Sequence, residues 1–295
     1  MSDYDLLSTD QSDQWDASRG WEATGSARTV DTSVPHDGRV RFRLLGPLEV
    51  VKDGRDHAPT APKVAQLLAM LLLRPGRLVT TEAIIQELWT ATPPRSARST
   101  VQTYVYQLRR CIDQNGLAPD AEAMLATRSS GYTMRVDPDQ IDVFEFQRRC
   151  RVGRVALTQR RYAEAAQLFN SALSLWSDAP LATVSCGAVL TGYAVDLEEQ
   201  RRNTQHLRIE AEIAGGLHRE LVGELRSMVS SNPLDEGLHG QLMRVLAHSG
   251  RRLEAMATYR QLRNRLAADL GVEPCGDLQV LHHELLSAGE PTRPR

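Results

Sequence analysis

Residues 96 to 112 constrain the fold of this chain more than any other segment, because their apolar residues form one stripe of a helix and arginines lie outside that stripe. The apolar residues recur at intervals of three and four positions, as one stripe of an α-helix does: Val101, Val105, Leu108 and Ile112. Four arginines and no acidic residue lie between positions 95 and 110. This pattern predicts a helix that packs on a domain with one face and contacts phosphates with the other. A surface helix with a solvated basic face is the alternative.

A small sheet and two more helices are predicted before this segment. Apolar residues alternate between positions 42 and 50, which favours strands, and Asp53-Gly54 favours a tight turn. A core helix starts at Pro62, and Thr80 is the predicted N-cap of a second helix. Ser96 is the predicted N-cap of the third helix, which carries the arginines.

A β-hairpin is predicted after the third helix, with strands at residues 124–127 and 132–136 on either side of Arg128. The order of sheet, three helices and hairpin is that of a winged helix-turn-helix domain, which we place at residues 39–138. In this architecture the third helix enters the major groove of DNA, and the hairpin can place an arginine in the minor groove.

Charge divides the chain into three zones. Residues 1–38 contain two basic and eight acidic residues, residues 39–137 contain 14 and nine, and the remainder contains 19 and 20. Only the middle zone is basic, which favours a nucleic-acid contact there. The first 38 residues have few aliphatic side chains, so we predict a disordered acidic arm over 1–38, and a short tail at 290–295.

The second half contains an internal repeat. Glu164, Glu220 and Glu254 each begin the same pattern, and the residues five positions later are Phe169, Leu225 and Tyr259. The last two copies are 34 residues apart, which is the tetratricopeptide period. The first interval is 56 residues, so an insertion of 56 − 34 = 22 residues is predicted there. Stacked helix pairs of this kind form a concave surface suited to holding another protein, although the array could simply pack on the DNA-binding domain.

The predicted fold is therefore mainly α with a small β component. A winged helix-turn-helix domain is followed by an all-α tetratricopeptide-like repeat domain over residues 139–289.

Sequence motifs of catalysis and cofactor binding are missing. The chain has no phosphate-binding loop, no dinucleotide fingerprint and no nucleophile elbow. His283-Glu284 starts a zinc-protease pattern, but Ser287 stands where the second histidine ligand belongs. The four cysteines form no C-x-x-C pair, and no apolar run approaches the roughly 18 residues of a membrane span. We therefore expect a cytoplasmic, nucleoid-associated protein that is not an enzyme and has no cofactor, metal or membrane partner.

The first domain resembles the OmpR-type winged helix of the SARP (AfsR-type) family of antibiotic regulatory proteins, through "TTEAIIQELW", "TVQTYVYQLRR" and "TRSSGYTM". The second domain resembles the bacterial transcriptional activation domain of that family, through "DVFEFQRR", "RYAEAAQLFNSALSLW", "DLEEQR", "LQVLHHELL" and the long run from "NPLDEGLHG" to "LGVEP". The resemblance covers about residues 41 to 286.

This resemblance implies a sequence-specific transcriptional activator of an antibiotic biosynthetic gene cluster. It further implies two protomers on direct repeats of double-stranded promoter DNA near the −35 region. RNA polymerase would be recruited there through the sigma factor and the C-terminal domain of the alpha subunit. A repressor, or a tetratricopeptide adaptor whose winged helix docks proteins, are the alternatives.

Candidate DNA-contacting residues form three groups. Residues on the exposed side of the third helix are expected to contact base edges: Gln102, Thr103, Tyr106 and Gln107. Basic and aromatic residues around them are expected to contact phosphates: Lys63, Arg98, Tyr104, Arg109 and Arg110. Arg128 in the hairpin matches the minor-groove arginine of such winged helices. Tyr106 and Gln107 depart from the residues common in relatives, so the base preferences of relatives do not transfer.

Overall fold

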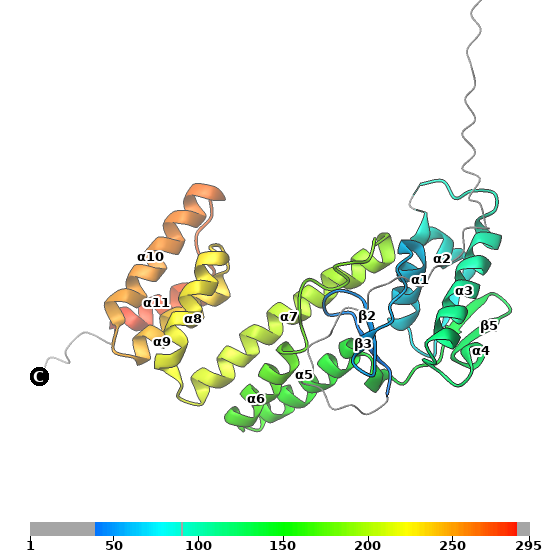
Figure 1. Ribbon diagram of the computed structural model, residues 1–295. Coiled ribbons are helices and arrows are strands. Elements are labelled where there is room, and N and C mark those ends of the chain that lie inside the picture. The colour runs from blue at the N-terminus through cyan, green and yellow to red at the C-terminus, as the bar shows by residue number, and fades with distance from the viewer. Residues whose placement is uncertain (1–38, 90, 288–295) are drawn as a thin grey trace, which may run out of the picture.

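One long helix, α7 (Ala188–Ala214), joins two groups of secondary-structure elements (Figure 1). This computed structural model describes residues 39–89 and 91–287. Sheets and short helices lie at one end of α7, and a separate set of helices lies at its other end. The predicted acidic arm at 1–38 and the predicted tail at 290–295 lie outside the described residues.

The chain begins with an antiparallel sheet in the order β1-β2-β3. Its strands are β1 (Arg41–Arg43), β2 (Glu49–Lys52) and β3 (Arg55–Asp56). The predicted turn at Asp53-Gly54 is confirmed, because both residues have positive φ, at 49° and 74°. Positive φ at both central residues is the geometry of the tight turn that matches strand twist.

The three predicted helices, a short fourth helix and a second sheet complete the predicted winged helix. The helices are α1 (Pro62–Leu72), α2 (Thr81–Leu88), α3 (Ala97–Gln114) and the short α4 (Ala121–Met124). The second sheet has the order β4-β6-β5, with β4 (Leu78–Thr80), β5 (Leu125–Arg128) and β6 (Gly131–Met134). The predicted hairpin is therefore confirmed, and we call β5 and β6 with their connecting turn, residues 125–134, the wing. Strand β4 is an addition that the sequence analysis missed.

The two predicted helix caps have different outcomes. Thr80 caps α2, because its hydroxyl accepts a hydrogen bond of 3.2 Å from the amide of Ala83. Ser96 precedes α3 as predicted, but a cap bond from its side chain is wrong. The backbone of Ser96 already has near-helical angles (φ −83°, ψ 6°), whereas a capping side chain needs an extended backbone to reach the free amides.

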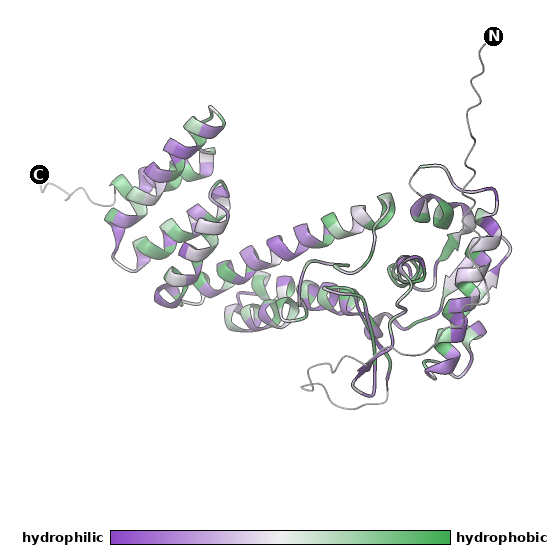
Figure 2. Cartoon of the chain, turned by 45° about the horizontal axis from the view of Figure 1, so that its top comes forward, coloured by the Kyte–Doolittle hydropathy of each residue, from purple (hydrophilic) through white to green (hydrophobic). Residues whose placement is uncertain are grey.

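The second half is helical, as predicted, after a short 3-10 turn, η1 (Pro138–Gln140). Besides α7, its helices are α5 (Asp142–Thr158), α6 (Tyr162–Leu173), α8 (His218–Ser231), α9 (Glu236–His248), α10 (Arg252–Asp269) and α11 (Gly276–Ser287). Glu164, Glu220 and Glu254 are the third residues of α6, α8 and α10. The repeated pattern therefore marks equivalent helix starts. Figure 2 shows hydrophobic and hydrophilic residues mixed along each of these helices, as expected when one side is packed.

Hydrophobic packing does not divide at residue 138. One core runs from Val40 through the winged helix to Leu197 in α7, and it includes Phe146 of α5 and Trp176. The rings of Phe146 and Trp176 meet edge to face, 5.3 Å between centroids. A second core, from Ile209 to Leu278, belongs to the end of α7 and to α8–α11. The winged helix and the first helices of the repeat domain thus share one core.

The connection between α6 and α7 packs on this shared core and is hydrogen-bonded to the segment that follows β1. The amide of Ser177 donates a 3.0 Å hydrogen bond to the carbonyl of Leu45, and the amide of Leu181 donates one of 3.0 Å to the carbonyl of Leu44. Leu44 and Leu45 directly follow β1. The carboxylate of Asp142, at the start of α5, accepts hydrogen bonds of 2.8 to 3.0 Å from the amides of Leu44 and Leu45. The predicted insertion is accommodated by this connection and by the length of α7, and it packs on the winged helix.

Candidate nucleic-acid interface

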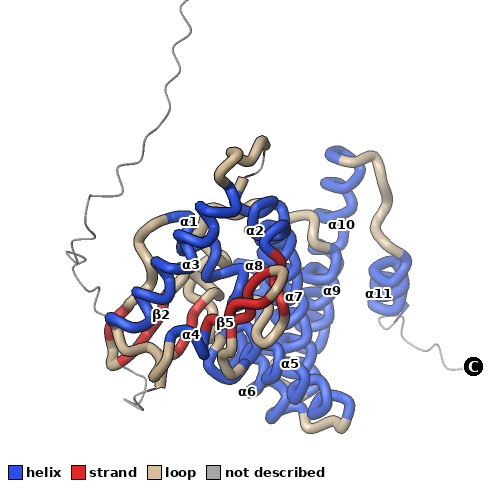
Figure 3. The backbone as a smooth tube through the Cα atoms, turned by 90° about the vertical axis from the view of Figure 1, so that its right-hand side faces the viewer, coloured by secondary structure: helices blue, strands red, loops and turns tan. Residues whose placement is uncertain are grey.

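Helix α3 has one buried face and one exposed face, as its sequence predicts. Val101, Val105, Leu108 and Ile112 are between 0 and 3% exposed. Gln102, Thr103, Tyr106 and Arg110 are exposed, and Gln107 is half-buried at the margin. Figure 3 looks onto the side of the molecule where α3 lies beside the wing. Tyr106, at 65% exposed, is the large aromatic residue of this face.

The wing carries Arg128 at the last position of β5, opposite Gly131 in β6. The turn is anchored to α2, because the amide of Thr81 donates a 3.0 Å hydrogen bond to the carbonyl of Ser130. Arg128 is exposed. Among the described residues, neither Arg128 nor Arg110 has a hydrogen-bond or ion-pair partner, so both guanidinium groups are available to an outside anion.

Three of the predicted phosphate ligands have partners inside the domain: Arg98, Lys63 and Arg109. Arg98 pairs with Glu82 at 2.5 Å, but both side chains are exposed, at 75% and 55%. Such a surface pair contributes little and can exchange for a phosphate. Lys63 donates to the carbonyl of Leu88 and, at 3.3 Å, to the side chain of Gln66. Lys63 therefore stabilises the carboxyl end of α2, where a cation is favoured.

Tyr104 lies between the two faces of α3. Its ring stacks on Trp89, with centroids 6.5 Å apart and 20° between the ring planes. Burial raises the pKa of the Tyr104 hydroxyl, so the group stays protonated and can donate a hydrogen bond. The stack holds Tyr104 of α3 against Trp89, the residue that directly follows α2.

Arg109 is held more firmly than the other arginines of α3, and its side chain is 19% exposed. Its Nε and Nη2 donate to the carbonyl of Leu125 at 3.1 and 2.7 Å. Nη2 also donates to the hydroxyl of Thr127 at 2.8 Å, and Nη1 to Glu122 at 3.3 Å. A phosphate contact is predicted for Arg109 from the sequence, but its guanidinium nitrogens donate to these groups of the domain. These partners are 13 to 18 residues away in the chain and cannot be read from helical spacing.

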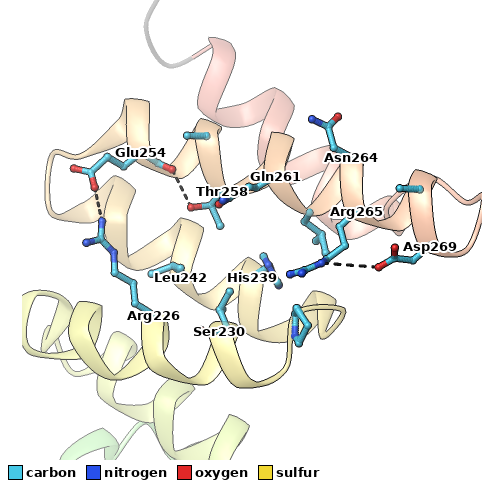
Figure 4. Close-up of a pocket in the computed structure, with 15 residues that line it drawn as sticks. Arg226, Ser230, His239, Leu242, Glu254, Thr258, Gln261, Asn264, Arg265 and Asp269 are labelled. Atoms are coloured by element: carbon cyan, nitrogen blue, oxygen red, sulfur yellow. Dashed lines mark hydrogen bonds and ion pairs between the residues drawn. The ribbon is translucent and has the colours of Figure 1, made fainter.

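The repeat domain has a groove of about 920 Å³ between α8 and α10 (Figure 4). Leu242 and the buried His239, both from α9, lie at its base. Its rims carry two ion pairs, Arg226 with Glu254 and Arg265 with Asp269. The charges of these pairs balance, so the groove has no strong preference for an acidic or a basic partner.

Metal and membrane sites do not emerge from the described part of the chain. In residues 39–89 and 91–287, no three His, Cys, Asp or Glu side chains are arranged to hold a metal ion. No helix in the same ranges has both the length and the apolar character of a membrane span.

Comparison with known families assigns both halves of the chain. Residues 56–134 match the family described as "Transcriptional regulatory protein, C terminal", and residues 141–286 match "Bacterial transcriptional activator domain". The chain is 35% identical over 255 residues to the regulatory protein DnrI of Streptomyces peucetius, covering 84% of this chain and 93% of DnrI. It is 34% identical to the regulatory protein AfsR of Streptomyces coelicolor, covering 85% of this chain but 24% of AfsR.

A solved structure has the same arrangement. Mycobacterium tuberculosis EmbR, determined in complex with a low-affinity phosphopeptide, matches with a TM-score of 0.80 and 30% sequence identity. The match covers 86% of this chain and 66% of the EmbR chain. These relatives are transcriptional regulators, and over the matched part the fold observed here is that of EmbR.

Proposed function

Because the chain belongs to the SARP (AfsR-type) family of transcriptional regulators, we propose that it is a sequence-specific DNA-binding activator. One observation carries this proposal: α3 exposes Gln102, Thr103, Tyr106 and Arg110, and it is joined through Arg109 to Leu125 and Thr127 of the wing, whose Arg128 is also exposed. An α-helix fits the major groove, and a wing arginine fits a narrow minor groove.

Each side chain of this surface has a proposed role. Gln102, Thr103, Tyr106 and Gln107 contact base edges in the major groove. Arg98, Tyr104 and Arg110 contact phosphates and fix the register of the protein on the duplex. Arg128 enters the minor groove. Lys63 and Arg109 are not among the proposed phosphate contacts, because their donors are used inside the domain.

Activation would proceed by contact with RNA polymerase. Two protomers bind direct repeats spaced by 10 to 11 base pairs, about one helical turn, near the −35 region, so that both α3 helices face one side of the duplex. The repeat domain and its neighbouring surfaces then contact the sigma factor and the C-terminal domain of the alpha subunit. The relationship to DnrI and AfsR supports an antibiotic biosynthetic gene cluster as the target.

The proposal is tested by footprinting, with and without RNA polymerase, on the promoters nearest the gene of this protein. We expect protection of two direct repeats, extended by polymerase, and more transcript from purified components. Less transcript would indicate a repressor. Binding to protein but to no promoter fragment would indicate the adaptor, for which the groove between α8 and α10 is the relevant surface.

A further inference from the structure

The two elements of the proposed DNA interface need a fixed relative position. Helix α3 and the wing must enter adjacent grooves together, so an error in the angle between them would misplace Arg128. In the wing, β6 is the central strand of its sheet and pairs with β4, whereas β5 lies at an edge of the sheet. Arg128 stands at the end of that edge strand.

On its outer side β5 has no neighbouring strand in the sheet, and Arg109 donates to a backbone carbonyl there. Arg135 donates from its amide to the carbonyl of Met124 at 2.7 Å, on the inner side of the hairpin. Since the bonds alternate along an antiparallel pair, the carbonyl of the next residue, Leu125, points outward. This is the carbonyl that accepts both bonds from Arg109. The guanidinium thus takes the place of a neighbouring strand.

We propose that Arg109 is a positioning residue, which fixes the wing against α3 and so aims Arg128 at the minor groove. This inference rests on the proposed function and refines its account of specificity. All three guanidinium nitrogens of Arg109 have partners, on β5 and on α4, and two of the accepting groups belong to residues within three positions of Arg128. A planar fork of donors can hold such an arrangement, and a lysine ammonium cannot reproduce it.

Arg110 provides a matched control. It is the next residue of the same helix, carries the same charge, is exposed and has no partner among the described residues. If charge alone mattered, replacing either arginine would have the same effect on DNA binding. If Arg109 positions the wing, replacing Arg109 should disturb the contact made by Arg128, whereas replacing Arg110 should not.

The test is a mutant cycle on the footprinted operator, with Arg109→Ala, Arg128→Ala and the double variant. We expect each single variant to weaken binding by roughly tenfold, as for one good groove contact. The double variant should lose no more operator affinity than whichever single variant binds more weakly, because Arg109 acts through Arg128. Additive losses would overturn the proposal.

Two further readouts separate positioning from a phosphate contact. Arg109→Lys should bind as weakly as Arg109→Ala, whereas Arg110→Lys should stay close to wild type; recovery in Arg109→Lys would indicate a phosphate ligand. Operators with the minor-groove A·T step changed to G·C should be discriminated by wild type but not by Arg109→Ala. Retained discrimination in Arg109→Ala would also contradict the inference.

A measurement without DNA keeps this inference distinct from the proposed function. Amide hydrogen exchange in the wing should be faster in Arg109→Ala than in wild type and unchanged in Arg110→Ala. Unchanged exchange in both variants overturns the positioning role. Failure of wild type to bind any promoter fragment overturns the proposed function instead.

Discussion

The carboxylate of Glu87, in α2 of the winged helix, accepts a 2.6 Å hydrogen bond from the amide of Gly187, at the start of α7. It also accepts bonds of 2.8 and 3.3 Å from the amides of Val189 and Leu190. Glu87 is 1% exposed, so one buried charge from the winged helix satisfies the free amides at the start of the central helix. The two domains are joined by a helix cap as well as by a shared core.

Removal of Glu87 should therefore destabilise the whole first core. Glu87→Ala leaves the amide of Gly187 and two amides in the first turn of α7 without this acceptor, which we expect to cost about 3 kcal/mol in the free energy of unfolding. Urea unfolding measures this loss. Glu82→Ala is the control, because Glu82 lies on the same helix in an exposed ion pair, and its removal should cost less than about 1 kcal/mol. Equal effects of the two substitutions would contradict the capping role of Glu87.

Gly187 should tolerate no side chain at this junction. A Cβ on Gly187 would lie 2.3 Å from the carbonyl oxygen of Glu87 and 2.8 Å from its carboxyl carbon. Gly187→Ala must separate α2 from α7 or distort the cap, so its melting temperature should fall by several degrees, an effect of about 1 to 3 kcal/mol. Thermal unfolding measures it, and an unchanged melting temperature would show that the junction relaxes freely.

Asp142 predicts a pH dependence of stability. Burial raises the pKa of this carboxyl from its ordinary value of 3.8 to about 6, although the amides of Leu45 and Leu44 oppose the shift. Between these two values the folded chain holds a proton that the unfolded chain has released. The contribution of Asp142 to stability is therefore largest below pH 4 and falls by about 3 kcal/mol as the pH rises from 4 to above 6.

Comparison of wild type with Asp142→Asn isolates this contribution, because the other titrating groups are common to both. The difference in free energy of unfolding should change between pH 4 and 6 and stay constant above about pH 7. A difference independent of pH over this window would mean that Asp142 is ionised throughout and that its hydrogen bonds with Leu44 and Leu45 outweigh burial.

Specific and general DNA contacts should respond differently to substitution. Gln102→Ala should cost about 1 to 3 kcal/mol on the operator and little on random DNA, because a base contact is lost. Arg110→Ala should weaken binding to both and lower the slope of log K against log salt by about one, because a phosphate contact is lost. Titrations at several salt concentrations measure both, and equal losses for Gln102→Ala on the two DNAs would refute its role.

The elements predicted correctly are those fixed by local sequence. The stripe of α3, the Pro62 helix start, the Thr80 cap and the glutamate-marked helices all follow from periodicity and capping within a few residues. Strand β4 was missed because three residues give too short a pattern, and it forms only because β6 pairs with it. The shared core, too, depends on contacts between distant segments.

The candidate site follows the same division. Exposure of Gln102, Tyr106 and Arg110 was predictable, since it depends on helical position alone. The partners of Lys63 and Arg109 were not, because they lie on other elements whose placement helical spacing does not report. Charge and position in the sequence could identify a basic residue near DNA. Which groups its N–H donors bond to depends on the tertiary structure.

Gly131 predicts how closely the wing is fitted to the domain. A Cβ at this position would lie 2.0 Å from the carbonyl oxygen of Val79 and 2.7 Å from the Cα of Thr80, both backbone atoms of β4. Gly131→Ala must therefore push the wing away from β4, and we expect a loss of at least about 2 kcal/mol in stability together with weaker operator binding.

Gly192→Ala is the control for this substitution. Gly192 lies within α7, and a Cβ there meets nothing within 4 Å, so alanine should leave operator binding unchanged and raise stability by up to about 1 kcal/mol through its better helix propensity. Urea unfolding and operator titration of both variants provide the measurement. If Gly131→Ala kept wild-type stability and affinity, the close approach of β6 to β4 would not be what holds Arg128 in position.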